Sequence, residues 1–171
     1  MSSPSPVSEA PAGSPSGNSR VCGSARAYRS KTVSTWLAVL GGTCGLHRFY
    51  LYGWADVWAW LHTPMSLLGL AGALRMRAFG QDDHWAWALI PVLGLMIAQS
   101  MAFAIVYALQ ADEAWDARRN PGHPPRMTRW GPVLGAVVAL AVGATVLMGT
   151  IAFGGQKFFE WQLQTRVSAD G

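Results

Sequence analysis

Long apolar runs without charge constrain this sequence more than any other feature. The two clearest are Trp85–Leu109 and Trp130–Phe153, and neither contains Asp, Glu, Lys or Arg. An α-helix needs about 20 such residues to cross a bilayer, so both runs predict transmembrane helices. The run Val57–Leu74 is just long enough for a further span, and its Pro64 is tolerated better in a membrane helix than in a soluble one.

The first apolar segment allows two interpretations. Taken as Val33–Leu46 it has fourteen residues, a length that suits a re-entrant or interfacial helix. Continued through His47 and Arg48 to Tyr52, it offers about 20 residues and predicts a span. An arginine within a turn of the membrane surface extends its guanidinium to the interface at modest cost. The sequence therefore favours four spans over three.

The composition agrees with an all-α integral membrane protein, a four-transmembrane-helix bundle. The chain is 51% hydrophobic and 13% charged, whereas soluble domains carry about 25% charged residues. Nine tryptophans suit membrane interfaces. The net charge of +4 comes from basic residues that flank apolar segments, and no nucleic-acid-binding module accompanies it. We expect the lipid bilayer as a partner and no nucleic acid.

Composition also divides the chain and bears on its origin. Arginine outnumbers lysine eleven to two, which is typical of a GC-rich bacterial genome and favours the inner membrane. The Ser/Pro/Gly-rich beginning predicts disorder, because it cannot bury enough apolar area. The predicted parts are a disordered tail, 1–30, a two-helix hairpin domain, 31–76, a second pair of transmembrane helices, 77–155, with a polar loop, 110–129, and a C-terminal tail, 156–171.

Four spans would place both termini on one side of the membrane. That side would hold eight Lys and Arg residues, and the other side five. Because basic residues concentrate on the cytoplasmic side, the count predicts cytoplasmic termini, by a small margin.

The stretch GGTCGLHRFYLYGW, from Gly41 to Trp54, carries a specific pattern. Over the segment Lys31–Met76 it resembles the two-transmembrane (TM-2) domain family, with a four-span bacterial subgroup as the nearest form. The matching positions are Gly45, His47, Arg48, Phe49, Tyr50, Leu51 and Gly53. The acid that the family often carries late in the second helix is missing. The resemblance implies membrane location and architecture, and no chemistry.

His47 and Arg48 have a structural and a recognition interpretation. In the first, both residues lie at a helix end near the headgroups, and Arg48 binds lipid phosphate or Asp56 across the turn. In the second, they recognise a partner or an anionic headgroup. Arginine binds phosphate and carboxylate in a bidentate manner that lysine cannot copy.

No pattern in the sequence predicts catalysis. There is no G-x-S-x-G, no paired intramembrane acid, and no His or Cys spacing typical of a metal site. We expect no enzyme activity, no cofactor and no metal. The remaining hypothesis is a docking surface, because the first turn and the polar loop emerge on one face. The alternative is an enzyme or transporter component whose site forms only with a partner.

Small residues recur every four positions in the last apolar run: Gly131, Gly135, Ala139 and Gly143. This spacing lets helix backbones approach closely. Packing is the expected role, and the partner is either another helix of the chain or a second copy, as in a homo-oligomer or with another membrane protein.

Overall fold

The computed structural model describes residues 27–170, and every regular element among them is a helix. The predicted disordered tail therefore lies outside the described residues except for positions 27–30. The helices are α1 (Lys31–Gly41), η1 (Gly42–Cys44), α2 (Leu46–Tyr52), α3 (Val57–Phe79), α4 (His84–Leu109), α5 (Asp112–Arg119) and α6 (Gly131–Asp170).

Three of these helices, α3, α4 and α6, are long and apolar enough to cross a membrane. They correspond to the three longer apolar runs, so this part of the prediction is confirmed. Within their most apolar windows, only 11 to 28% of the residues are buried inside the protein. Large side chains such as Leu67, Leu95 and Leu140 are more than half exposed. Outward apolar surface of this extent indicates a membrane protein whose helix faces contact lipid.

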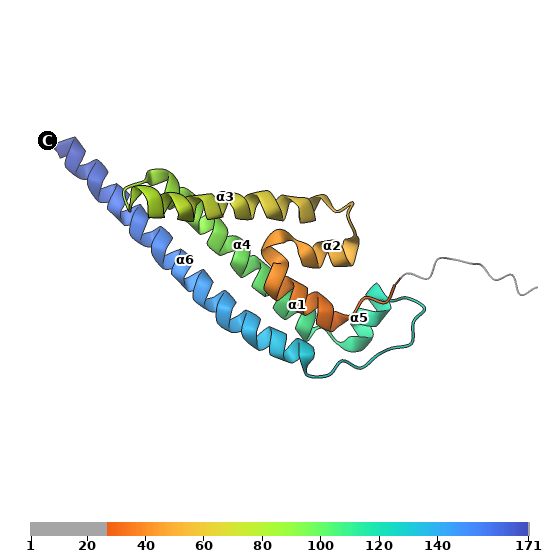
Figure 1. Cartoon of the computed structure of the whole chain (residues 1–171). Coiled ribbons are helices and arrows are strands. Elements are labelled where there is room, and N and C mark those ends of the chain that lie inside the picture. The colour runs from red at the N-terminus through yellow and green to blue at the C-terminus, as the bar shows by residue number, and fades with distance from the viewer. Residues whose placement is uncertain (1–26, 171) are drawn as a thin grey trace, which may run out of the picture.

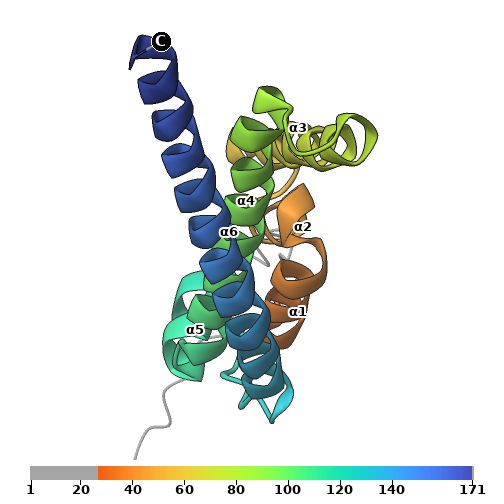
Figure 2. The same ribbon diagram turned by 90° about the vertical axis from the view of Figure 1, so that its left-hand side faces the viewer.

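Helix α4 lies at the centre of the packing. It contacts α6, α3 and α1, and Figure 2 shows α6 on one side of it and α3 with α2 on the other. Small residues permit these approaches. An added Cβ at Gly72 would lie 2.4 Å from Leu89 Cβ, and one at Gly94 would lie 1.9 Å from Thr150 Oγ1. Close backbone contact thus replaces large interlocking side chains, as is common between membrane helices.

The row of small residues on α6 packs inside the chain. A Cβ at Gly135 would lie 2.6 Å from Thr35 Cγ2 of α1, and one at Gly143 would lie 2.8 Å from Met101 Cβ of α4. Ala139 has no exposed surface. Helices α1 and α4 therefore pack against this face within the chain, and self-association through it stays a prediction.

The first apolar segment is not one helix, contrary to the four-span prediction. Helix α1 ends at Gly41, and η1 leads to Gly45, whose φ of +73° reverses the chain before α2. This left-handed conformation favours glycine. A side chain there would also collide with α3, since a Cβ would lie 2.6 Å from the Ala59 carbonyl oxygen. Glycines inside the segment that was predicted to cross as one helix thus break it.

Helices α1 and α2 form a hairpin, shaped like a V in Figure 1. The Tyr50 hydroxyl accepts a 3.0 Å bond from the Ser30 amide, so the hairpin's two open ends lie together. Its tip rests on α3, where Ser66 Oγ donates to the Thr43 carbonyl at 2.7 Å. Side chains of α3 thus satisfy carbonyls that the broken helix leaves free. This is the condition under which irregular backbone is tolerated at membrane depth.

The described ends of the chain lie at opposite ends of the helices (Figure 1). The predicted placement of both termini on one side assumed a fourth crossing, whereas three of the described helices are long and apolar enough to cross. Two segments also differ from prediction in their local structure. The polar loop 110–129 contains α5, and the C-terminal tail 156–171 is helical through Asp170. At 40 residues, α6 is about 60 Å long, twice the apolar thickness of a bilayer.

Replacing Gly135 by isoleucine tests the packing of α6. The new side chain must displace Thr35, and overpacking of this kind costs about 1–3 kcal/mol. We expect Gly135→Ile to lower the unfolding temperature of the purified protein, measured by tryptophan fluorescence in detergent. Gly149→Ile is the matched control, because nothing lies within 4 Å of a Cβ at that position. Equal unfolding temperatures for the two variants would contradict this packing.

Candidate functional site at the polar end of the helices

Polar side chains gather where the chain enters α1, leaves α2 and passes from α4 to α6. We call this region the polar end; it comprises residues 27–31, 48–56 and 110–130. Arg119 Nη2 donates to the Tyr52 hydroxyl at 2.9 Å, which joins α5 to α2. Lys31 Nζ donates to the Gln110 carbonyl at 2.9 Å, which joins α1 to the end of α4. The first turn and the long loop do emerge together, as expected from the sequence.

Asp112 connects the chain segments in one half of the polar end. Its carboxylate binds the Lys31 ammonium and accepts bonds from the amide and hydroxyl of Thr128. Burial acts to raise the pKa of Asp112, but the bonds from Lys31 and Thr128 outweigh it and hold the pKa below the usual value. The ion pair fixes the start of α1 to the start of α5. The residues that precede α6 are attached to the same carboxylate.

In the other half of the polar end, Asp116 and Asn120 form hydrogen bonds with the segment 27–30. Asp116 accepts bonds from the Tyr28 hydroxyl at 3.0 Å and the Arg126 amide at 2.8 Å. Asn120 Oδ1 accepts from the Arg29 amide at 2.7 Å, and Trp115 Nε1 donates to the Arg29 carbonyl at 2.8 Å. Residues 28 and 29 are therefore fixed by α5 and the residue that follows it.

No role was assigned to Asp116, Trp115 or Asn120 in the sequence analysis. A signal was available in the segment Asp112–Arg119. Acids occupy its first turn and arginines its last, which favours a short helix through the helix dipole. On such a helix, positions 116 and 120 share a face.

Arg48 takes the structural role that the sequence analysis considered. Its Nε lies 2.8 Å from Asp56 Oδ2, and its guanidinium stacks over the Tyr52 ring at 5.1 Å. The other carboxylate oxygen of Asp56 accepts a bond from the Trp58 amide and caps α3. The bond from Arg48 lowers the pKa of Asp56. Arg48 thus fixes the turn between α2 and α3, and its charge is already paired.

His47 lies away from the headgroup position that was expected for it. It has no exposed surface and packs against Phe103 and Tyr107 of α4, with ring centroids 5.5 and 5.8 Å away. The His62 ring of α3 lies 5.9 Å away, and its Nδ1 is 2.6 Å from the Trp58 carbonyl. Both nitrogens of His47 and Nε2 of His62 are buried without a hydrogen-bond partner in the described part of the chain.

The other motif residues pack or shape the hairpin formed by α1 and α2. Leu51 is buried in the core, and Phe49 packs against Trp54 and Trp60 at 5.1 and 5.3 Å. Tyr50 holds Ser30, as described above. Gly53, with φ +87°, ends α2.

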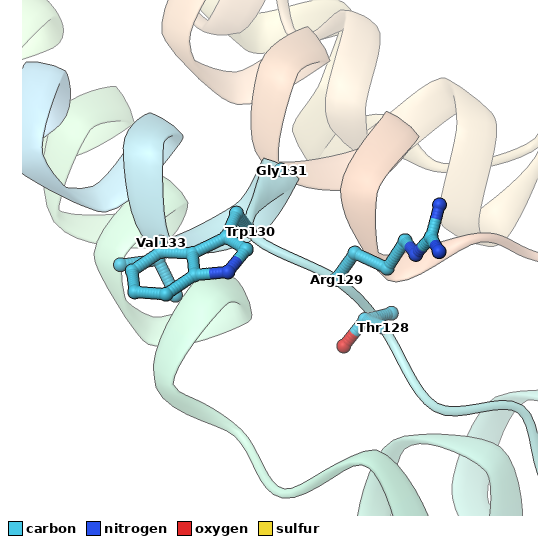
Figure 3. Close-up of a pocket in the computed structure, with 5 residues that line it drawn as sticks. All are labelled: Thr128, Arg129, Trp130, Gly131 and Val133. Carbon is cyan, nitrogen blue, oxygen red and sulfur yellow. The ribbon is translucent and has the colours of Figure 1, made fainter.

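Two hollows open at the polar end. One, of about 780 Å³, lies at the start of α6, and Figure 3 shows its Arg129 and Trp130 side chains pointing in different directions. Its polar groups do not converge, so it lacks the arrangement of a specific ligand site. The other, of about 610 Å³, lies between residues 27–29, α2 and α5, and three arginines line it. Within residues 27–170, no three His, Cys, Asp or Glu side chains gather as metal ligands.

Comparison with family models, curated proteins and solved structures finds no match to this chain. The class of protein therefore follows from the fold alone. It is an all-helical protein with three helices suited to crossing a membrane and a polar end held by hydrogen bonds. The resemblance to the TM-2 family remains a prediction.

Replacing Asp112 by asparagine tests the ion pair with Lys31. The variant leaves a buried ammonium without its counter-charge, so we expect a loss of about 2 kcal/mol at neutral pH. Because folding lowers the pKa of Asp112, its contribution is present above pH 4 and is lost as the pH falls through the folded-state pKa. The unfolding temperature of the wild type should therefore decline more steeply from pH 5 to pH 3 than that of Asp112→Asn.

The exposed neighbour Glu113 supplies the control for this measurement. Glu113→Gln removes the same charge from the same helical turn, without an ion pair in the described structure. It should keep the wild-type acid profile. Parallel profiles for Asp112→Asn and the wild type would show that this ion pair does not stabilise the fold.

Replacing Arg48 by lysine tests the turn between α2 and α3. Lysine keeps the charge, but it lacks the planar group that both pairs with Asp56 and stacks on Tyr52. We expect Arg48→Lys to lose about 1 kcal/mol of unfolding free energy and some accumulation in cells. Arg77→Lys, in a residue without a recorded ion pair, is the control. If the two variants are equally stable, the guanidinium geometry at position 48 is unimportant.

Proposed function

We propose that the protein is a non-catalytic integral membrane protein that acts through contacts with lipids or protein partners at its polar end. The observation that carries this proposal is the use of the aspartates there. Asp56, Asp112 and Asp116 all serve as structural acceptors, as described above. An acid or base for catalysis needs a group free to exchange a proton with a substrate. The arginines of the second hollow, in contrast, are free to bind.

The same proposal includes a TM-2-like architecture in a bacterial inner membrane. The seven motif residues and their position before a tight turn support the resemblance. The excess of arginine over lysine supports the bacterial origin. In this proposal three helices cross the membrane, and the hairpin α1–α2 enters it and returns on the same side.

Orientation follows from the charges at the two ends. Seven described basic residues lie at the polar end: Arg29, Lys31, Arg48, Arg118, Arg119, Arg126 and Arg129. Four lie toward the opposite end: Arg75, Arg77, Lys157 and Arg166. By the positive-inside rule the polar end is cytoplasmic, and the C-terminal end of α6 is on the opposite side.

Reporter fusions at the C-terminus test this orientation. Alkaline phosphatase fused after Gly171 should be active, and a green fluorescent protein fused there should be dark. The control is the same pair of reporters fused after Asn120 at the polar end, where the result should be reversed. A fluorescent C-terminal fusion would contradict the orientation, since it would place the C-terminal end of α6 in the cytoplasm.

The alternative is a membrane enzyme or transporter component that is complete only with a partner. Its supporting observation is the pair His47 and His62. A buried nitrogen without a hydrogen bond costs about 1–3 kcal/mol, and such groups are often kept for function. A partner's polar group could complete this site.

Affinity capture of the tagged full chain in mild detergent separates the two proposals. A stoichiometric protein partner or a retained lipid, without chemical change to either, supports the non-catalytic role. A co-purifying metal in stoichiometric amount, or a lipid converted to product on incubation, would contradict it. A His47→Phe variant is the matched control, because loss of the metal or conversion in it would assign the activity to the histidine pair.

A further inference from the structure

The second hollow at the polar end is lined by basic and aromatic residues from three separate segments. Its lining is Ala27, Tyr28, Arg29, Tyr50, Leu51, Tyr52, Arg118 and Arg119. Residues 27–29 form one side, the end of α2 another, and the last turn of α5 a third. No carboxylate lines it. At about 610 Å³, it lies within the range of sites that hold small molecules.

The positive charge of this hollow is not neutralised within the described structure. The ion pairs recorded for residues 27–170 are Lys31–Asp112, Arg48–Asp56, Arg75–Asp83 and Lys157–Glu160. None involves Arg29, Arg118 or Arg119. Asp116, the acid nearest in sequence to Arg118, is buried and accepts bonds from Tyr28, Asn120 and the Arg126 amide. Three arginines thus line one hollow, and none of them forms an ion pair within residues 27–170.

Arg119 has its guanidinium held in place before any ligand arrives, and Arg29 has its backbone held. The Arg119 guanidinium lies over the Tyr52 ring at 4.7 Å and the Trp115 ring at 5.8 Å, and it donates to the Tyr52 hydroxyl. Arg29 has its amide and carbonyl bound by Asn120 and Trp115, which fixes the point where its side chain starts. Less conformational entropy is lost on binding when the donors are already positioned.

We propose that this hollow binds the phosphate group of an anionic ligand, which is either the headgroup of an anionic lipid or a free phosphate. Guanidinium forks match phosphate oxygens in geometry and charge. The lining also includes Tyr50 and Tyr52, whose hydroxyls accept bonds from Ser30 and Arg119 and so keep a proton to donate. The position at the end of the membrane helices brings lipid headgroups within reach, and the cytoplasmic leaflet is the anionic one. This inference rests on the proposed interaction role and gives it a ligand class.

The test compares two double variants of the full chain in detergent. Arg29→Gln with Arg118→Gln removes two charges from the hollow and keeps the backbone bonds of Arg29 and the contact of Arg119 with Tyr52. Arg77→Gln with Arg166→Gln removes two charges from the opposite end and is the matched control. The probes are dioctanoyl phosphatidylglycerol, dioctanoyl phosphatidylcholine and inorganic phosphate. Binding is measured by native mass spectrometry and by the rise in unfolding temperature.

We expect phosphatidylglycerol to bind the wild type and the control more tightly than phosphatidylcholine does. Loss of the two arginines should weaken this binding by about tenfold or more. Inorganic phosphate that binds equally well, with the same dependence on Arg29 and Arg118, would assign the site to free phosphate. Weak phosphate binding beside strong phosphatidylglycerol binding would assign it to lipid.

Equal binding of phosphatidylglycerol and phosphate to the wild type and to the Arg29 and Arg118 double variant would overturn the inference. The inference would also be overturned if neither phosphatidylglycerol nor phosphate bound the wild type. An equal unfolding temperature without ligand shows that the variant is folded. A protein partner captured in stoichiometric amount would still support the interaction role in that case, so the two proposals fail separately.

Discussion

Backbone groups inside a bilayer must find partners within the protein, and the break between α1 and α2 depends on this constraint. The interruption at residues 42–45 frees carbonyls from helical hydrogen bonds, and in the proposed arrangement lipid offers them no donor. Ser66 donates to the Thr43 carbonyl, and Thr63 donates to that of Cys44 at 3.3 Å. Gly45 then rests on the backbone at Ala59 without a side chain between them. The hairpin therefore needs α3 beside it, and the rest of the arrangement follows from that contact.

Because α2 runs back beside the start of α1, both ends of the hairpin lie at α5. Residues 28–31 thereby reach Asp112, Asp116 and Asn120, which a crossing helix would have placed on opposite sides of the membrane. One face of α1 also packs against the row of small residues on α6. One break in one helix thus determines the polar end, the packing of α6 and the basic hollow that the proposed ligand would occupy.

The sequence predicted the three long helices well, since length and absence of charge suffice for that. It placed the ends of α3 and α4 within a few residues, apart from the last turn of α3. It failed at the first segment, because a run of apolar residues does not reveal whether neighbouring side chains will support a break. The sequence also did not predict the hydrogen bonds of Trp115 and Asn120. Their partners lie 86 and 91 positions away, and only the folded chain brings them together.

The central claim is that α1 enters and leaves on the side where α6 begins, and a designed disulfide tests it directly. A Cβ at Gly131 would lie 3.7 Å from Thr32 Cβ, close to the usual spacing across a disulfide. In a chain with Cys22→Ser and Cys44→Ser, the pair Thr32→Cys and Gly131→Cys should cross-link within one molecule under mild oxidation. The pair Thr32→Cys and Gly149→Cys should not. An uncross-linked first pair in folded protein would contradict the account, because a crossing α1 separates these positions by about 30 Å.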